Sequence, residues 1–158
     1  MTATEGRPPV NGRQRANVNA LALATELRGR IKGEVRFDAG TRAIYAHDSS
    51  NYRQVPFGVV VPKDSEDVVA AIEVCRRHGA PVLPRGCGTS LSGETTNVAV
   101  VVDTSKYMRE IFEVNPKEGY ARVQPGVVRD QLSDMTRRGM GRSSRPTPPH
   151  TNTQLWAV

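Results

Sequence analysis

The sequence predicts an α/β fold with some α+β character, built on a small sheet that contains a βαβ unit and is flanked by helices. The apolar run GVVVP (58–62) has the length of a buried strand and ends at a proline. A helical pattern over 63–80 follows it, and then a second short strand, APVLP (80–84). Since a strand, a helix and a strand this close together form a crossover unit, we expect the two strands to be parallel.

The helix of this unit carries clear start and stop signals. Asp64 or Ser65 can cap its first turn, and Gly79 suits the left-handed residue that ends a helix. Acidic residues follow the start and basic residues precede the end, as the helix dipole favours. The side chains predicted to share its buried face are Val68, Ala71, Ile72 and Cys75.

The segments before this unit give weaker signals. Residues 1–16 have the composition of a disordered tail. Residues 17–55 are expected to form an N-terminal helix and a lead-in segment, in which HDSSNYRQVP (47–56) has loop character. The apolar residues that partly fit a helical stripe in this helix are Leu21, Leu23, Leu27 and Ile31.

The segments after residue 97 continue the α/β pattern. VAVVVD (98–103) has the character of another buried strand. EIFEV and YARVQ flank NPKEG, whose composition predicts the turn of a hairpin. GVVRDQLSDMTRRG (126–139) is expected to be a helix.

Composition excludes several classes of function. The net charge is +6, but the basic clusters near the two ends are not interleaved with aromatic residues, which argues against nucleic-acid binding. The two cysteines and the polar start, which shows no secretory segment, indicate reduced thiols in a cytoplasmic compartment. No apolar run approaches the roughly 18 residues of a membrane span. His47, His78 and His150 are too far apart to indicate a metal site.

The stretch PRGCGTSLSGETTN (84–97), called the glycine loop below, is the most informative segment for function. It leads from one strand toward another rather than into a helix, and it contains no lysine. It therefore fits neither the Walker loop nor the dinucleotide-binding fingerprint, both of which open a helix.

The chemistry of the glycine loop nevertheless suits an anion. Its glycines let successive main-chain N–H groups face one point, with no Cβ in the way. Hydroxyl donors and the charge of Arg85 lie in the same stretch. From these residues alone, a plain surface turn remains an open alternative. The hydroxyl donors are Thr89, Ser90 and Ser92.

A family resemblance favours the anion. The run from FGVVVP through PRGCGTSLSGETTN, together with VVVDTSKYMREIFEVNP and ARVQPGV, resembles the FAD-binding domain of the vanillyl-alcohol oxidase/p-cresol methylhydroxylase family. The branch it most resembles is that of the bacterial D-lactate dehydrogenase and glycolate-oxidase-like enzymes. YAHDSSNYRQVP also resembles the lead-in of that branch, so the likeness covers about residues 44–140. Residues 56–140 would then be part of an FAD-binding domain.

The resemblance implies FAD as cofactor and a role for each matching stretch. Pro125 and Gly126 resemble a turn that lies against the cofactor. Cys87 is a candidate for covalent flavin attachment or, as the alternative, a small thiol tolerated in the loop, whereas Cys75 is expected in the core. The residues that resemble the pyrophosphate loop are Arg85, Gly86, Cys87, Gly88, Thr89, Ser90, Leu91, Ser92 and Gly93.

The last segment, GRSSRPTPPHTNTQLWAV (141–158), departs from the family pattern. A shifted reading of its degenerate codons permits PDPSTHEHTTMGG, which resembles the continuation that the family shows. We therefore expect residues 141–158 to be translated out of frame in a truncated copy of a longer protein, and we assign them no site. The neighbouring frame of the gene tests this expectation, because it should continue the family sequence.

The function implied is the FAD-binding portion of an oxidoreductase that oxidises a 2-hydroxy acid of the D-lactate or glycolate type. No catalytic residue is assigned, because the resemblance places those residues in a separate substrate domain, and we expect the chain to be inactive alone. Two alternatives remain: a subunit that needs a separately encoded catalytic partner, and a non-enzymatic nucleotide- or phosphate-binding module. Full-length relatives are expected in the cytoplasm or peripheral to the inner membrane.

Overall fold

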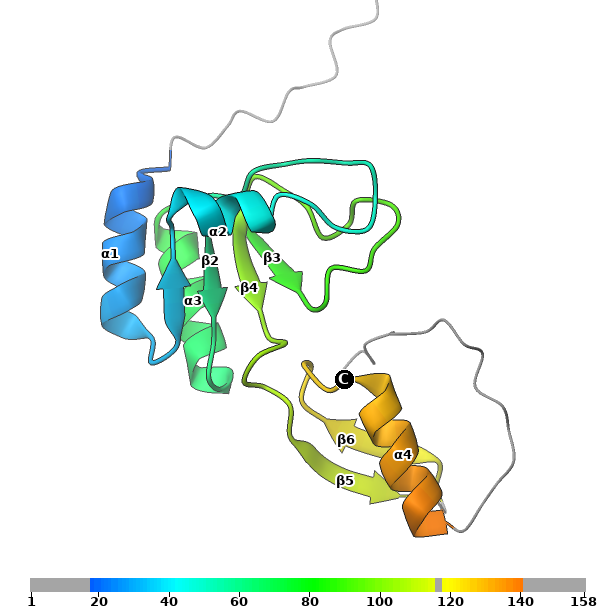
Figure 1. Ribbon diagram of the computed structural model, residues 1–158. Coiled ribbons are helices and arrows are strands. Elements are labelled where there is room, and N and C mark those ends of the chain that lie inside the picture. Colours follow the sequence, from blue (N-terminus) through cyan, green and yellow to red (C-terminus); the bar gives the residue numbers. More distant parts are fainter. Residues whose placement is uncertain (1–17, 116–117, 141–158) are drawn as a thin grey trace, which may run out of the picture.

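The computed structural model of the protein describes residues 18–115 and 118–140 (Figure 1). The expected tail at 1–16 and the expected out-of-frame segment at 141–158 lie outside these residues. The helices are α1 (Ala20–Arg30), α2 (Ala39–Ile44), α3 (Ser65–Arg77) and α4 (Arg129–Met140). The strands are β1 (Glu34–Arg36), β2 (Gly58–Val61), β3 (Val82–Arg85), β4 (Val100–Asp103), β5 (Ile111–Asn115) and β6 (Tyr120–Val123).

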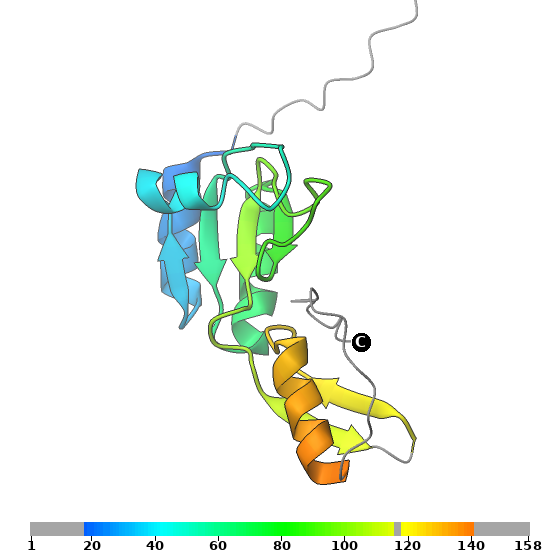
Figure 2. The same cartoon turned by 45° about the vertical axis from the view of Figure 1, so that its right-hand side comes forward.

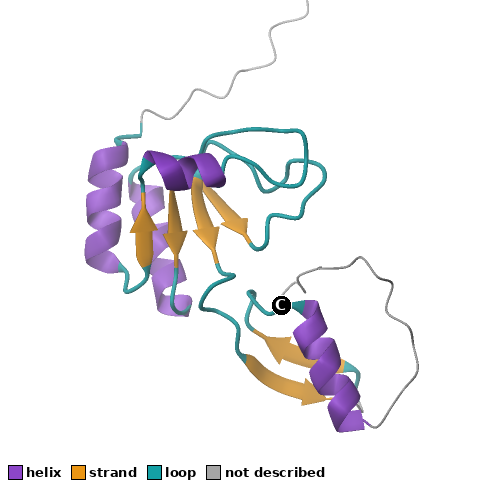
Figure 3. Ribbon diagram, viewed as in Figure 1, coloured by secondary structure: helices purple, strands orange, loops and turns teal. Residues whose placement is uncertain are grey.

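Four of these strands form a mixed sheet in the order β1-β2-β4-β3 (Figure 3). Strands β2 and β3 both pair with β4 in parallel, so the parallel βαβ unit is confirmed, with β4 lying between its two strands. Strand β1 pairs with β2 in the antiparallel direction. The parallel core with an antiparallel edge confirms the predicted class, an α/β sheet with α+β character that is flanked by helices.

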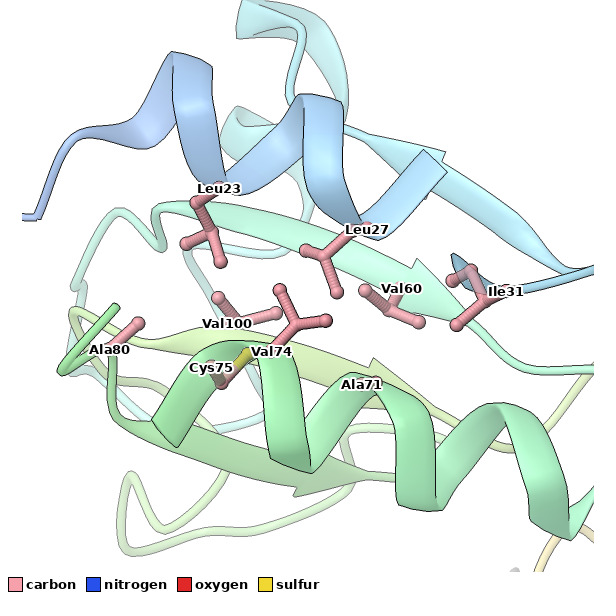
Figure 4. Close-up of a cluster of buried hydrophobic side chains, with 9 residues drawn as sticks. All are labelled: Leu23, Leu27, Ile31, Val60, Ala71, Val74, Cys75, Ala80 and Val100. Carbon is pink, nitrogen blue, oxygen red and sulfur yellow. The ribbon is translucent and has the colours of Figure 1, made fainter. Parts of the chain in front are cut away.

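The main apolar core lies between this sheet and the pair α1 and α3 (Figure 4). Leu23 and Leu27 of α1 and Val74 of α3 are fully buried against Val60 and Val100 of the two central strands. Full burial of one such side chain contributes about 1.5–3 kcal/mol. This face is therefore the main apolar source of stability, and it fixes the position of the central strands.

The buried face of α3 differs from the predicted one. Val68 is only half-buried and Ile72 is 47% exposed, whereas Asp67 and Val74 point inward with Ala71 and Cys75. The physical reason is a buried carboxylate: Asp67 accepts hydrogen bonds from the main-chain N–H groups of residues 32 and 63, at 2.8 and 2.9 Å. Turning Asp67 inward also turns Val74 inward, seven positions on, and moves Ile72 to the surface.

The lead-in segment contains two elements that the sequence did not predict, β1 and α2. Each is short, three and six residues, so neither gives a periodic apolar signal. Pairing with β2 holds β1 in place, and Asp38 caps α2 by accepting from the N–H of Thr41 at 2.8 Å. The loop character of 47–56 is confirmed, apart from an isolated bridge between His47 and Arg53. Leu23 and Leu27 of α1, and Ile31 directly after it, are buried as expected, but Leu21 is 77% exposed.

The predicted hairpin and last helix form a second unit (Figure 2). Strands β5 and β6 pair in the antiparallel direction, and α4 follows them. The chain reaches this unit through residues 104–110, directly after β4. Its small apolar cluster consists of Val123, Val127 and Leu132, packed against Ile111, Val114 and Ala121.

Candidate cofactor-binding site

The glycine loop begins at the carboxyl edge of the parallel strands. Arg85, the last residue of β3, lies opposite Asp103, the last residue of β4. In open sheets with parallel strands, ligands bind beyond the carboxyl ends of the strands. The loop is therefore placed where this architecture binds cofactors.

Two of the three loop glycines have backbone conformations that other residues rarely adopt. Gly88 has φ +69° and Gly93 has φ +76°, whereas Gly86 lies outside the left-handed region. A Cβ on Gly88 would lie 2.4 Å from Nη2 of Arg85, and one on Gly93 would lie 2.6 Å from the ring of Tyr52. Glycine is thus required at 88 and 93 both by conformation and by close packing.

The main-chain amides of the loop fall into two groups. The N–H groups of Ser92 and Glu94 donate to Oγ of Ser90, and the N–H of Thr96 donates to the carbonyl of Gly93. The N–H groups of the consecutive residues 88–91 donate to no acceptor within the described parts of the chain. We call these amides the amide cup. A buried or ligand-facing N–H needs an acceptor, so this run is the part of the loop suited to phosphate oxygens.

The hydroxyl groups do not act alike. Ser90 Oγ, besides accepting the two amides, lies 3.2 Å from Oε2 of Glu94, so Ser90 shapes the loop from within. Thr89 and Ser92 are exposed, as is Leu91, at 80%. Cys87 is also exposed, so its thiol lies at the surface of the loop. The ligand roles expected for these residues remain predictions.

The guanidinium of Arg85 binds main-chain carbonyls of the protein. Its Nη2 donates to the carbonyl of His47 at 2.8 Å, and its Nη1 donates to the carbonyl of Thr95 at 3.0 Å. The guanidinium carbon lies 5.1 Å from the centre of the Tyr45 ring. The sequence indicated a local positive charge for an anion, but these donors are used by protein carbonyls.

Tyr45 and Asp103 form a contact that sequence reasoning missed. The Tyr45 hydroxyl donates to Oδ2 of Asp103 at 2.5 Å, and Asp103 is buried at the end of β4. Burial, and then the hydrogen bond to the Asp103 carboxylate, raise the pKa of Tyr45 to about 12. The two residues lie 58 positions apart with no shared motif, so no spacing in the sequence could have paired them.

The segment 46–54, called the lead-in loop below, lies against the glycine loop. The N–H of Ser49 donates to the carbonyl of Gly88 at 3.1 Å, and Oγ1 of Thr95 donates to Oδ2 of Asp48 at 3.0 Å. Burial would raise the pKa of Asp48, but hydrogen bonds from Ser50 and Thr95 outweigh it and hold that pKa below its ordinary value. The lead-in loop thus forms one wall of the site.

The turn at Pro125 and Gly126 reaches the same edge of the sheet. The N–H of Gly126 donates to the carbonyl of Met108 at 2.8 Å, and a Cβ on Gly126 would lie 2.3 Å from the carbonyl oxygen of Thr104. Thr104 in turn donates its N–H to the carbonyl of Arg85 at 3.2 Å. The structure therefore brings together the two stretches that the sequence singled out, through residue 104.

The other cysteine and the histidines have different surroundings. Cys75 is buried in the core as expected, and burial raises the pKa of its thiol to about 11. His47 is exposed, whereas His78 at the end of α3 is half-buried, with Nε2 at 2.7 Å from Glu26. Within residues 18–115 and 118–140, no group of three or more His, Cys, Asp or Glu side chains is placed to hold a metal ion. Over the same residues, no helix combines the length and the apolar character that a bilayer span requires.

Together, a parallel sheet edge and a glycine loop with donor amides define the class: a nucleotide-cofactor-binding α/β domain. The chain belongs to the FAD binding domain family, whose model matches residues 56–148. FAD is therefore the cofactor, and the flavoprotein oxidoreductases are the wider group to which this domain belongs.

Two groups of relatives support the assignment. The D-2-hydroxyglutarate dehydrogenase of Pseudomonas putida is 36% identical over 65% of this chain and 10% of its own length. The glycolate oxidase subunit GlcD of Escherichia coli K12 is 44% identical over 49% of this chain and 16% of its own length. The chain thus spans only a small part of the curated relatives it matches.

Solved structures confirm the fold. p-Cresol methylhydroxylase with bound substrate matches with a TM-score of 0.65 at 21% identity, over 75% of this chain and 24% of that enzyme chain. The 4-ethylphenol oxidase of Gulosibacter chungangensis matches with a TM-score of 0.63 at 22% identity, over 80% of this chain and 26% of the other. The fold is that of the first part of the FAD-binding domain of the vanillyl-alcohol oxidase/p-cresol methylhydroxylase type.

Proposed function

We propose that the glycine loop holds the diphosphate of FAD, and that the turn at Pro125 and Gly126 closes the same site from the side of the hairpin unit. The single observation that carries this proposal is the amide cup, four consecutive donors in the loop that leaves the carboxyl end of β3. A diphosphate needs several convergent donors and close backbone approach, and Gly88 and Gly93 permit both.

The residues of the glycine loop are chemically suited to the diphosphate of FAD. The amide cup offers neutral donors, and Ser90 and Gly93 hold the rest of the loop in shape by accepting from residues 92, 94 and 96. When bound, the flavin supplies the redox chemistry by accepting a hydride equivalent. The part played by this chain is to bind and orient the cofactor by its diphosphate end.

We further propose that the whole protein oxidises a 2-hydroxy acid of the D-lactate or glycolate type. Support comes from the relatives, which are named for D-2-hydroxyglutarate and for glycolate, both 2-hydroxy acids. We assign no catalytic residue within the described part of the chain. The substrate would be bound by residues beyond the matched region, so the chain by itself should bind FAD without turnover.

Titration of the purified 158-residue chain with flavins tests the assignment. We expect FAD to bind, measured by quenching of flavin fluorescence, and to bind at least about tenfold more tightly than riboflavin, which lacks the phosphates. The complex should show flavin absorbance near ~370 and ~450 nm. Equal affinity for FAD and riboflavin would contradict a diphosphate site. Tighter binding of ADP or pyrophosphate than of FAD would favour a general phosphate-binding module.

A further inference from the structure

Arg85 joins two segments that flank the proposed diphosphate site. Its guanidinium donates to the carbonyl of His47 in the lead-in loop at 2.8 Å and to the carbonyl of Thr95, near the end of the glycine loop, at 3.0 Å. A third carbonyl, that of Tyr45, lies at the limit of bonding distance, 3.5 Å. One planar side chain thus holds both segments by their main chain, and the fixed fork of an arginine suits such a contact.

The guanidinium is itself fixed from the sheet side. It lies over the Tyr45 ring, and the Tyr45 hydroxyl is bonded to the buried carboxylate of Asp103 at the end of β4. The carbonyl of Arg85 accepts from the N–H of Thr104. The guanidinium is therefore positioned by contacts within the protein.

Gly88, the first residue of the amide cup, packs directly on this guanidinium. An added Cβ at Gly88 would lie 2.4 Å from Nη2 and 2.8 Å from Cζ of Arg85. On its other side, the carbonyl of Gly88 accepts from the N–H of Ser49 in the lead-in loop. The carbonyl of Gly88 and the N–H of Thr89 belong to one planar peptide, so holding that carbonyl sets the direction of the Thr89 N–H, from which the rest of the amide cup continues.

We propose that Arg85 is a positioning residue: it sets the direction of the amide cup by binding the carbonyls of His47 and Thr95, and it does not bind the diphosphate. The inference rests on the proposed function of the amide cup. An arginine in this loop could either bind the phosphate or position the main chain, and the residue type alone does not distinguish these two roles. A phosphate ligand needs the positive charge, which lysine keeps, whereas the carbonyl contacts need the planar fork, which lysine lacks.

Two substitutions separate these roles in the full chain, Arg85→Lys and Arg85→Met. We expect both to weaken FAD binding by about tenfold or more, because neither can bridge the carbonyls. Arg122→Met, at an exposed position on β6, is the matched control and should change FAD affinity by less than about twofold. If Arg85→Lys binds FAD like the unaltered chain while Arg85→Met does not, charge is what matters and the proposal is wrong.

Main-chain amide NMR spectra supply a readout that does not need FAD. In Arg85→Lys without ligand, the signals of Gly88 and Leu91 should move or broaden, while those of Val59 and Val101 in the sheet stay in place. Unchanged amide signals of residues 88–91 in the variant would overturn the proposal. This result does not depend on FAD binding, so it can be told apart from a failure of the proposed function.

A measurement on the unaltered chain guards against a variant that does not fold. When FAD is added, the amide signals of residues 88–91 should shift strongly, and the guanidinium Nη signals of Arg85 should shift little. A strong shift of the guanidinium signals with FAD would show direct contact with the phosphate and would refute the positioning role.

Discussion

The sheet face covered by α1 and α3 and the sheet edge that carries the glycine loop are stabilised by different kinds of interaction. On the side of α1 and α3, side chains such as Leu27 and Val74 pack on Val60 and Val100 and are fully buried. At the edge that carries the glycine loop, directional contacts dominate: Arg85 binds main-chain carbonyls, and Tyr45 binds Asp103. The first region depends on buried area, and the second on the geometry of a few hydrogen bonds.

This difference separates stability from cofactor binding. Apolar burial is non-directional and stabilises the sheet as a whole. Hydrogen bonds to main-chain atoms contribute only about 1 kcal/mol each, but they fix where amides point. Substitutions on the helical face should therefore act mainly on unfolding, and substitutions at the loop edge mainly on FAD.

The largest expected effect is that of Leu27→Ala on the helical face. Leu27 is fully buried among α1, α3 and β2, so its truncation leaves a cavity. We expect the free energy of unfolding to fall by about 2–5 kcal/mol, measured by urea denaturation. Leu21→Ala is the matched control, because Leu21 on the same helix is 77% exposed and should cost less than about 0.5 kcal/mol. Equal losses in the two variants would mean that this face is not the apolar core.

The contrast between the two regions also explains what the sequence could predict. Strands β2 to β6, α3 and the position of the glycine loop follow from local patterns, and the structure confirms them, whereas β1 and α2 were too short to predict. The inward turn of Asp67 is set by amides from two other segments, so the pattern on α3 alone placed Ile72 inside and left Val74 out.

At the site, the sequence located the right segments but not the use of each side chain. The glycines required at 88 and 93 and the turn at Gly126 could be identified from residue type and resemblance. The carbonyl contacts of Arg85 could not, because their partners come from loops whose positions depend on the tertiary fold. An arginine in a glycine loop predicts a positive charge near the site, but only the tertiary structure shows which groups its guanidinium contacts.

A smaller effect is expected when Tyr45 ionises. The raised pKa of Tyr45, about 12 against an ordinary 10.0, means that the folded chain favours the neutral phenol. The stability from this group is complete below pH 10.0 and is lost as the pH rises through about 12. Because the ring is only half-buried, we expect a loss of about 1 kcal/mol rather than the full value of the shift.

Absorbance of the tyrosinate measures this ionisation directly. The difference between the titrations of the native chain and of Tyr45→Phe should show one group ionising near pH 12. Tyr52→Phe, at a position 60% exposed, is the control and should leave the alkaline loss of stability in place. A difference titration centred near pH 10.0 would mean that the contact with Asp103 does not hold in solution.

The smallest expected effect is a gain in affinity from Glu94→Gln. Glu94 follows the amide cup within the glycine loop, and its Oε2 lies 3.2 Å from Oγ of Ser90. Glutamine keeps an oxygen for that contact and leaves the main-chain N–H of residue 94 bonded to Ser90, so the loop should retain its shape. Removing a negative charge beside a proposed diphosphate site should tighten FAD binding by about two- to fivefold, and less at high salt.

Glu118→Gln, at an exposed position in the hairpin turn, is the matched control and should bind FAD like the native chain. Weaker binding by Glu94→Gln would mean that the carboxylate orders the loop more than it repels the phosphates, which would place Glu94 with Arg85 among the groups that shape the site.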